Sequence, residues 1–79
     1  MNVSVKLFGT LPRHVPGYDA RSGLVVALPE GADVGRLIEQ LGIPASRLGM
    51  VSVDGKLVKS SHRLQGGERV HVFQRIFGG

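Results

Sequence analysis

The 79-residue sequence contains no cysteine and no tryptophan, and aromatic residues make up only 5% of it. Without cysteine the chain has no thiol that could act as a nucleophile, a redox centre or a zinc ligand. Its three histidines lack metal-ligand spacing, and its serines stand in no nucleophile motif. We therefore expect no metal site and no catalytic constellation within the chain.

Long apolar runs and runs of like charge are also missing. No stretch approaches the roughly 20 apolar residues that span a bilayer, and residues 1–8 do not resemble a signal peptide. We expect a cytoplasmic protein with no membrane partner. The net charge is +4, but the basic residues are scattered. Nucleic-acid binding usually needs clustered positive charge and aromatic platforms, so an acidic protein partner explains the charge at least as well.

The length suits a single small domain, which we assign to residues 1–79. A hydrophobic content of 42% argues against disorder. A domain of this size buries only about 60–65% of the surface of its unfolded chain. The core is therefore thin, and a deep active site is hard to build, which favours a carrier or binding role over an enzyme.

Alternating apolar residues predict the strands of the domain. We expect a first strand at Val3–Phe8 and a last strand at Val70–Ile76. The segment Gly9–Gly23 predicts a long loop with room for a helical turn near Leu11. A second strand is expected at Leu24–Leu28, antiparallel to the first.

One helix is predicted between these strands. Asp33 can cap its first amides, and Gly42 suits the left-handed position that ends a helix. Four apolar residues between them recur at helical spacing: Val34, Leu37, Ile38 and Leu41.

A hairpin is predicted after the helix. Asp54-Gly55 forms a two-residue turn between short strands at Val51–Val53 and Lys56–Val58. Leu64 is expected to turn inward on the way to the last strand.

These elements predict an α+β fold in which a mixed sheet packs on one main helix, with the first and last strands adjacent and parallel. The opposite sheet face then carries Phe8, His71 and Phe73. Exposed aromatic side chains next to one another predict a partner surface. The alternative is that the loop Gly9–Gly23 folds over them.

The sequence closes with Phe77-Gly78-Gly79. Two glycines leave the last carboxylate unshielded and let the backbone bend, and an extended segment from Gln74 to Gly79 reaches about 20 Å. We expect a flexible Gly-Gly tail that enters a partner's active site and presents the Gly79 carboxylate. A carboxylate must first be activated, most simply as an acyl-adenylate. Because the chain has no recognisable ATP site, we expect ATP to be used by the partner and no cofactor to be bound here.

Together these features resemble the ubiquitin-like β-grasp proteins, and most closely the MoaD/ThiS family of sulfur carriers. The final strand is also similar to that of ubiquitin, with His71 and Arg75 at matching places. The segments that carry the resemblance follow one another in the family's order: Val5-Lys6-Leu7-Phe8, Leu28-Pro29-Glu30-Gly31-Ala32-Asp33-Val34, Leu41-Gly42-Ile43-Pro44, Val53-Asp54-Gly55-Lys56, Leu64, Gly67-Glu68-Arg69-Val70 and Gly78-Gly79.

The resemblance implies a sulfur carrier that is a protein co-substrate and not an enzyme, or the small subunit of a synthase such as molybdopterin synthase. A ubiquitin-activating-type adenylyltransferase would adenylate Gly79, a sulfurtransferase persulfide would displace AMP, and the resulting thiocarboxylate would pass sulfur to an acceptor synthase subunit. Arg75 would contact an acidic site on the activating enzyme. The partner-binding residues assigned on this basis are Phe8, Leu57, His71, Phe73, Arg75 and Phe77.

Three alternatives stay open at this point. The acceptor pathway is one, since chain length slightly favours molybdopterin or tungsten cofactor over thiamin, while Gln74–Phe77 lacks the prolines common before the glycine pair in molybdopterin-type carriers. A ubiquitin-like modifier conjugated to lysines through Gly79 would share the fold and the tail. An RNA-binding β-grasp module would explain the charge and would not need Gly78-Gly79.

Overall fold

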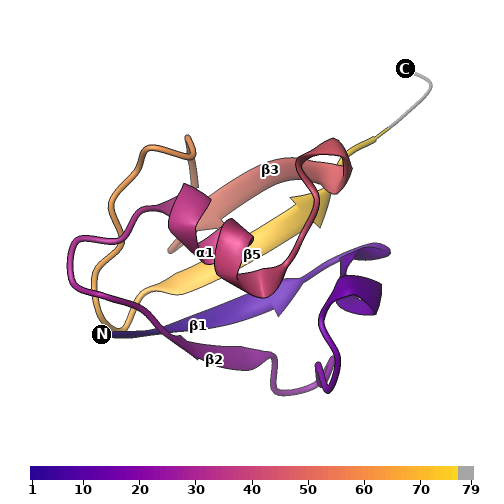
Figure 1. The fold of residues 1–79 in the computed structure, drawn as a ribbon, viewed down its shortest axis with the longest axis horizontal. Helices are drawn as coiled ribbons and strands as arrows, with labels where there is room; N and C mark the ends of the chain where they lie inside the picture. The colour runs from indigo at the N-terminus through magenta and orange to yellow at the C-terminus, as the bar shows by residue number, and fades with distance from the viewer. Residues whose placement is uncertain (77–79) are drawn as a thin grey trace.

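The computed structural model describes residues 1–76. Its five strands form one mixed sheet in the order β2-β1-β5-β3-β4, and helix α1 lies across one face of that sheet (Figure 1). The α+β arrangement expected from the sequence is therefore confirmed. The elements in chain order are β1 (Asn2–Leu7), the 3₁₀ helix η1 (Leu11–His14), β2 (Leu24–Ala27), α1 (Val34–Leu41), the 3₁₀ helix η2 (Ala45–Arg47), β3 (Leu48–Val53), β4 (Lys56–Val58) and β5 (Arg69–Gln74).

The first and last strands lie side by side in the middle of the sheet. β1 and β5 are parallel, with Val5 opposite Val70 and Leu7 opposite Val72. The outer pairs are antiparallel: β2 on β1, β3 on β5, and β4 on β3. Parallel strands cannot be joined by a tight turn, so the whole chain between β1 and β5, including α1, forms the connection.

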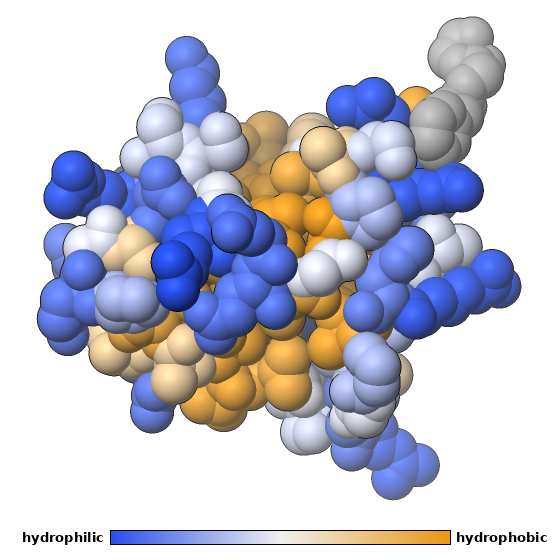
Figure 2. Space-filling view, in the orientation of Figure 1, coloured by the Kyte–Doolittle hydropathy of each residue, from blue (hydrophilic) through white to orange (hydrophobic). Residues whose placement is uncertain are grey.

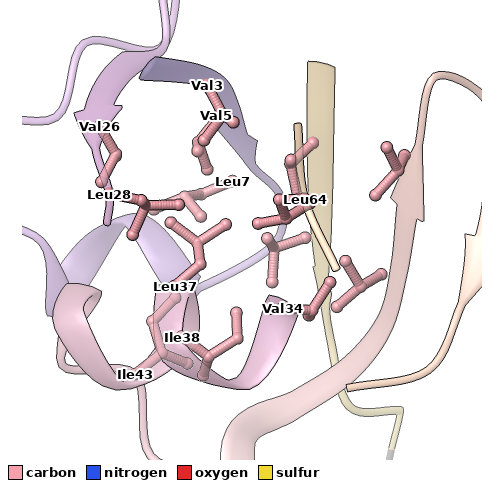
Figure 3. Close-up of a cluster of buried hydrophobic side chains, with 14 of the residues drawn as sticks. Val3, Val5, Leu7, Val26, Leu28, Val34, Leu37, Ile38, Ile43 and Leu64 are labelled. Atoms are coloured by element: carbon pink, nitrogen blue, oxygen red, sulfur yellow. The ribbon is translucent and has the colours of Figure 1, made fainter. Parts of the chain in front are cut away.

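The core lies between α1 and the sheet (Figure 3). Val5, Val70 and Val72 are at most 1% exposed, and Leu37 of α1 is fully buried against this cluster. Leu41, which we expected beside Leu37, is only partly buried at the edge of the core. Because α1 is short, apolar side chains remain visible between polar ones on the helix side of the molecule (Figure 2).

The loop after β1 contributes to the core, which its sequence did not indicate. Leu11 in η1 is fully buried in the core cluster. The hydroxyl oxygen of Tyr18 accepts a hydrogen bond of 2.8 Å from the Leu7 amide. The loop therefore closes one end of the core and is held against the end of β1.

Local signals placed the caps and the hairpin correctly. The Asp33 carboxylate accepts a 2.8 Å hydrogen bond from the Arg36 amide, and Gly42 ends α1 with φ = 75°. Asp54 and Gly55 both have positive φ, at 48° and 85°, as a two-residue turn between β3 and β4 requires.

Four strands have bounds that differ from the sequence prediction, and of these β2 ends at Ala27 and not at Leu28. β1 covers Asn2–Leu7 and not Val3–Phe8, although the Phe8 amide still donates to Val72 O at 3.0 Å. β3 begins at Leu48 and not at Val51, with an irregular register against β5 between these residues. β5 covers Arg69–Gln74 and not Val70–Ile76, and its last ladder pair is Gln74 with Leu48, beside which the Arg75 amide donates to the Arg47 carbonyl at 2.8 Å.

No helix within residues 1–76 is long and apolar enough to cross a membrane.

Replacing Leu37 tests the packing of α1 on the sheet. Leu37→Ala should lower the free energy of unfolding by roughly 2–5 kcal/mol, because the cavity forms where the surroundings are fully packed. The measurement is urea unfolding followed by circular dichroism. Glu39→Ala is the matched control, since Glu39 is exposed on the same helix, and it should change the free energy by less than about 0.5 kcal/mol. Equal unfolding midpoints for the two variants would contradict this packing.

Candidate functional site

The sheet face opposite α1 carries the side chains that the sequence singled out. On β1 and β5 the residues that alternate with the core point to this outer face, so that Lys6 lies opposite His71. The hydrogen bond from the Phe8 amide to Val72 O continues the pairing beyond the end of β1. It therefore brings Phe8 beside Phe73.

These aromatic side chains form a cluster. The Phe8 and Phe73 rings are stacked, with centroids 4.8 Å apart and planes 13° apart. The His71 ring meets Phe8 edge-on at 5.3 Å. Contacts of this kind contribute about 0.5–1.5 kcal/mol beyond burial, so they hold the rings in a fixed arrangement. Phe8 is 38% exposed, and the cluster is accessible because the loop that follows it turns inward at Leu11.

Leu57 lies two strands away on the same face. Ser52 of β3 pairs with His71 on one side and with Leu57 on the other, so the three residues form a row across β5, β3 and β4. Leu57 is 67% exposed. Met50, which is 54% exposed on β3, was not among the expected site residues. If the predicted strand had started at Leu48, the alternation of Met50 with Ser52 would have placed Met50 on this face.

The end of β5 is held at two points. The Arg75 amide bonds to Arg47 O, as described above, and the Gln74 side-chain oxygen accepts a 2.7 Å hydrogen bond from the Thr10 hydroxyl. Arg75 is exposed directly after this anchor, and Ile76 is 83% exposed. The chain therefore leaves the folded body at a defined place. The assigned residues Phe77, Gly78 and Gly79 lie outside the described residues.

Positive charge gathers next to this end of β5. Thr10, Arg13, His14 and Arg47 line a shallow pocket of about 230 Å³, and no carboxylate lines it. Within residues 1–76 no group of three or more His, Asp or Glu side chains could hold a metal ion. The guanidinium groups of Arg13 and Arg47 are the charged groups in this pocket that can contact an anion.

Comparison with known families identifies the group to which this geometry belongs. The model of the Mut7-C ubiquitin family matches residues 1–76. The chain belongs to the Mut7-C ubiquitin family. The expected ubiquitin-like character is therefore confirmed at the level of the family. No match is found among the curated proteins.

Solved structures resemble this Mut7-C ubiquitin chain over nearly its whole length. A protein from Pyrococcus furiosus described as molybdopterin converting factor, subunit 1, has a TM-score of 0.72 and 23% identity, covering 96% of this chain and 99% of that one. SAMP1 from Haloferax volcanii has a TM-score of 0.69 and 17% identity, with both chains covered completely. A structure of small archaeal modifier protein 1 of H. volcanii has a TM-score of 0.72 and 16% identity, covering 95% and 98%.

At these identities the likeness shows the fold. The ubiquitin-like β-grasp expected from the sequence is confirmed for the Mut7-C ubiquitin chain, with one helix packed on a five-stranded mixed sheet.

Gly49 tests the junction between β3 and the end of β5. An added Cβ there would lie 2.5 Å from the Gln74 carbonyl oxygen and 2.9 Å from that of Phe73. Both are backbone atoms, so Gly49→Ala should destabilise the fold by roughly 1–3 kcal/mol and shift the amide resonances of Gln74 and Arg75. Urea unfolding and amide NMR spectra measure the two effects.

Gly66→Ala provides the control for this substitution. The nearest contact of an added Cβ at Gly66 is Met1 Cβ at 3.6 Å, an ordinary van der Waals distance. An equal effect of the two substitutions would show that the close approach at Gly49 does not determine how β5 ends.

Proposed function

We propose that this chain is a ubiquitin-like sulfur carrier whose Gly79 carboxylate is activated by a partner enzyme and converted to a thiocarboxylate. The observation that supports this most directly is the way the chain leaves the domain. β5 is central in the sheet, its end is anchored through Gln74 and Arg75, and Ile76 is 83% exposed just before the segment Phe77-Gly78-Gly79. A fixed body followed by two residues without side chains suits delivery of a carboxylate into another active site.

The conversion of the Gly79 carboxylate to a thiocarboxylate would take three steps. A carboxylate oxygen of Gly79 attacks the α-phosphate of ATP on an adenylyltransferase of the ubiquitin-activating type, which gives the acyl-adenylate and releases pyrophosphate. A sulfurtransferase persulfide then attacks the acyl carbon and displaces AMP, leaving an acyl disulfide. A second thiol of the partner then attacks the sulfurtransferase sulfur of this acyl disulfide. The sulfur–sulfur bond breaks, the thiocarboxylate stays at Gly79 of this chain, and a disulfide forms between the two partner sulfurs.

In this proposal the chain is a co-substrate and not an enzyme. It binds no cofactor of its own, works in the cytoplasm and finally meets an acceptor synthase subunit. The fold shared with a protein described as molybdopterin converting factor, subunit 1, favours the molybdopterin or tungsten branch over thiamin. The outer face would supply the docking contacts through Phe8, Leu57, His71 and Phe73, and Arg75 would meet an acidic site on the activating enzyme.

Conjugation to other proteins is the second candidate. It is favoured by the fold shared with small archaeal modifier protein 1. The adenylation of Gly79 would be the same, but a lysine amine would attack the activated carbonyl and form an isopeptide bond. The two candidates differ in the product found in cells: a thiocarboxylate on the free chain, or a ladder of conjugates.

Intact mass of the protein from its native cells separates these products. A sulfur carrier should show the mass increase of one oxygen replaced by sulfur at Gly79. A modifier should show branched peptides in which Gly79 is joined to lysine. If Gly79 in the mature protein is joined to a following residue of the same polypeptide and is never cleaved from it, both candidates are contradicted.

Variants of the tail test activation directly. Deleting Gly78-Gly79 or adding one residue after Gly79 should abolish ATP–pyrophosphate exchange by the cognate activating enzyme, because the added residue moves the carboxylate about 3.5 Å along the chain. Amide NMR spectra of the body should stay unchanged. Equal exchange rates for the native and altered tails would show that the tail takes no part in the chemistry. They would favour the alternative of an RNA-binding β-grasp module.

The outer face is tested by Phe73→Ala. Losing the ring that stacks on Phe8 should weaken binding to the activating enzyme by more than about 1 kcal/mol, measured by titration calorimetry with the native chain as reference. Val25→Ala is the control, since Val25 is 67% exposed on β2, at the other edge of the sheet. If both variants bind as the native chain does, this face is not the docking surface.

A further inference from the structure

A notch at the β4 edge of the sheet shares Leu57 and Arg75 with the docking contacts proposed above, but its other lining residues have no part in that function. β3 runs from Leu48 to Val53, but β4 pairs only with Val51–Val53. The other edge of β3 is occupied by β5. Within the part of the chain that the structure describes, Leu48–Met50 thus has no strand on the β4 side.

The notch is built by the start of α1. The Ser60 carbonyl accepts a 2.9 Å hydrogen bond from the Gly35 amide, and the His62 carbonyl accepts one of 3.0 Å from the Val34 amide. Amides in the first turn of a helix have no partner within the helix, so these bonds satisfy them. They also direct the chain away from β3 directly after Val58. The gap is therefore a fixed consequence of how α1 is capped.

The walls of the notch are largely apolar. It is an open pocket of about 570 Å³ whose lining includes the core residues Val34 and Val51. Met50 and Leu57, 54% and 67% exposed, line the same pocket. The backbone at this edge is irregular, because the register of β3 against β5 shifts between Leu48 and Val51 and the Leu48 amide donates to the Ala45 carbonyl. The apolar walls are therefore the feature that a partner segment can contact. The remaining apolar residues of the lining are Ala45, Leu48 and Val58.

The charges of the notch indicate what would occupy it. Lys59 and Arg75 both line it, and no aspartate or glutamate does. A second copy of this chain, paired through the same edge, would bring another Lys59 and Arg75 against these two. Like charges placed opposite each other oppose such pairing. An acidic partner has the complementary charge.

We propose that this notch binds an extended segment of a partner protein, which lies along Leu48–Met50 in the place where β4 would have continued. Its alternate side chains are apolar and enter the pocket, and carboxylates beside them meet Lys59 and Arg75. The stretch without a strand partner is three residues long, about 10 Å at 3.3 Å per residue. Burial of the apolar side chains in the pocket supplies affinity, and the two cations supply selectivity.

This inference does not depend on Gly79. A chain without Gly78-Gly79 keeps β3, α1 and both cations, so it should still bind such a segment even if the tail carries no chemistry. Failure of the carrier function and failure of this site are therefore measured separately.

The test uses the full chain and a displayed library of random heptapeptides. Selected peptides should alternate apolar residues and carry Asp or Glu near their ends. Bound to the chain, they should shift the amide resonances of Met50 and Leu57, whose side chains line the notch. Replacing the apolar residues of a selected peptide with serine should abolish binding.

Charge reversal separates this notch from the outer face. Lys59→Glu combined with Arg75→Glu should weaken binding of an acidic peptide by about tenfold or more, and replacing the peptide's carboxylates with lysines should restore it. Lys6→Glu combined with Arg69→Glu is the control, because it makes the same change in charge at β1 and β5 and should leave peptide binding unchanged.

Several results would overturn the proposal. They are a library that yields no binder, binders that shift the resonances of Phe8 and Phe73 instead, and binding that is indifferent to the charge of the notch. Concentration-dependent dimerisation that shifts the resonances of Met50 and Leu57 would assign the notch to a second copy of the chain and would overturn it as well.

Discussion

The parallel pairing of β1 with β5 is the constraint on which the rest of the structure depends. It joins residues near opposite ends of the chain, and its inward side chains, among them Val5 and Val72, form the centre of the core. The same backbone register fixes the outer face, because the bond from the Phe8 amide to Val72 O stacks Phe8 on Phe73. Core and candidate docking surface are thus two sides of one ladder, and a shift of one residue would exchange them.

Features with a local cause were predictable from the sequence. Asp33 caps α1 by accepting a hydrogen bond from the amide of Arg36, three residues further along the chain. Asp54-Gly55 needs only its own backbone to form the turn. The alternation along β1 and β5 was enough to place Phe8, His71 and Phe73 on one face. These predictions succeeded because helix caps, tight turns and strand alternation involve residues close together in the sequence.

Features that depend on distant contacts were not predictable. The predicted strand starts at Val51, yet β3 starts at Leu48 and passes through Gly49, where a residue without Cβ lets β3 approach the backbone of Phe73 and Gln74. Alternation alone extends β5 to Ile76, but β3 begins only at Leu48, so Gln74 is the last residue of β5 that has a strand partner. The notch was missed for the same reason, since it exists only because the carbonyls of Ser60 and His62 turn to α1.

The outer face and the notch meet at β3, so one partner can contact both surfaces at once. Met50 and Leu57 are exposed beside the notch, and Leu57 also continues the row from His71 across the outer face. Arg75 lines the notch and is the residue at which the chain is anchored before it leaves the body. A partner that engages both surfaces grips the sheet on either side of this anchor. The point at which the chain leaves the body is then fixed on the partner, which would lower the entropic cost of the proposed delivery of Gly79.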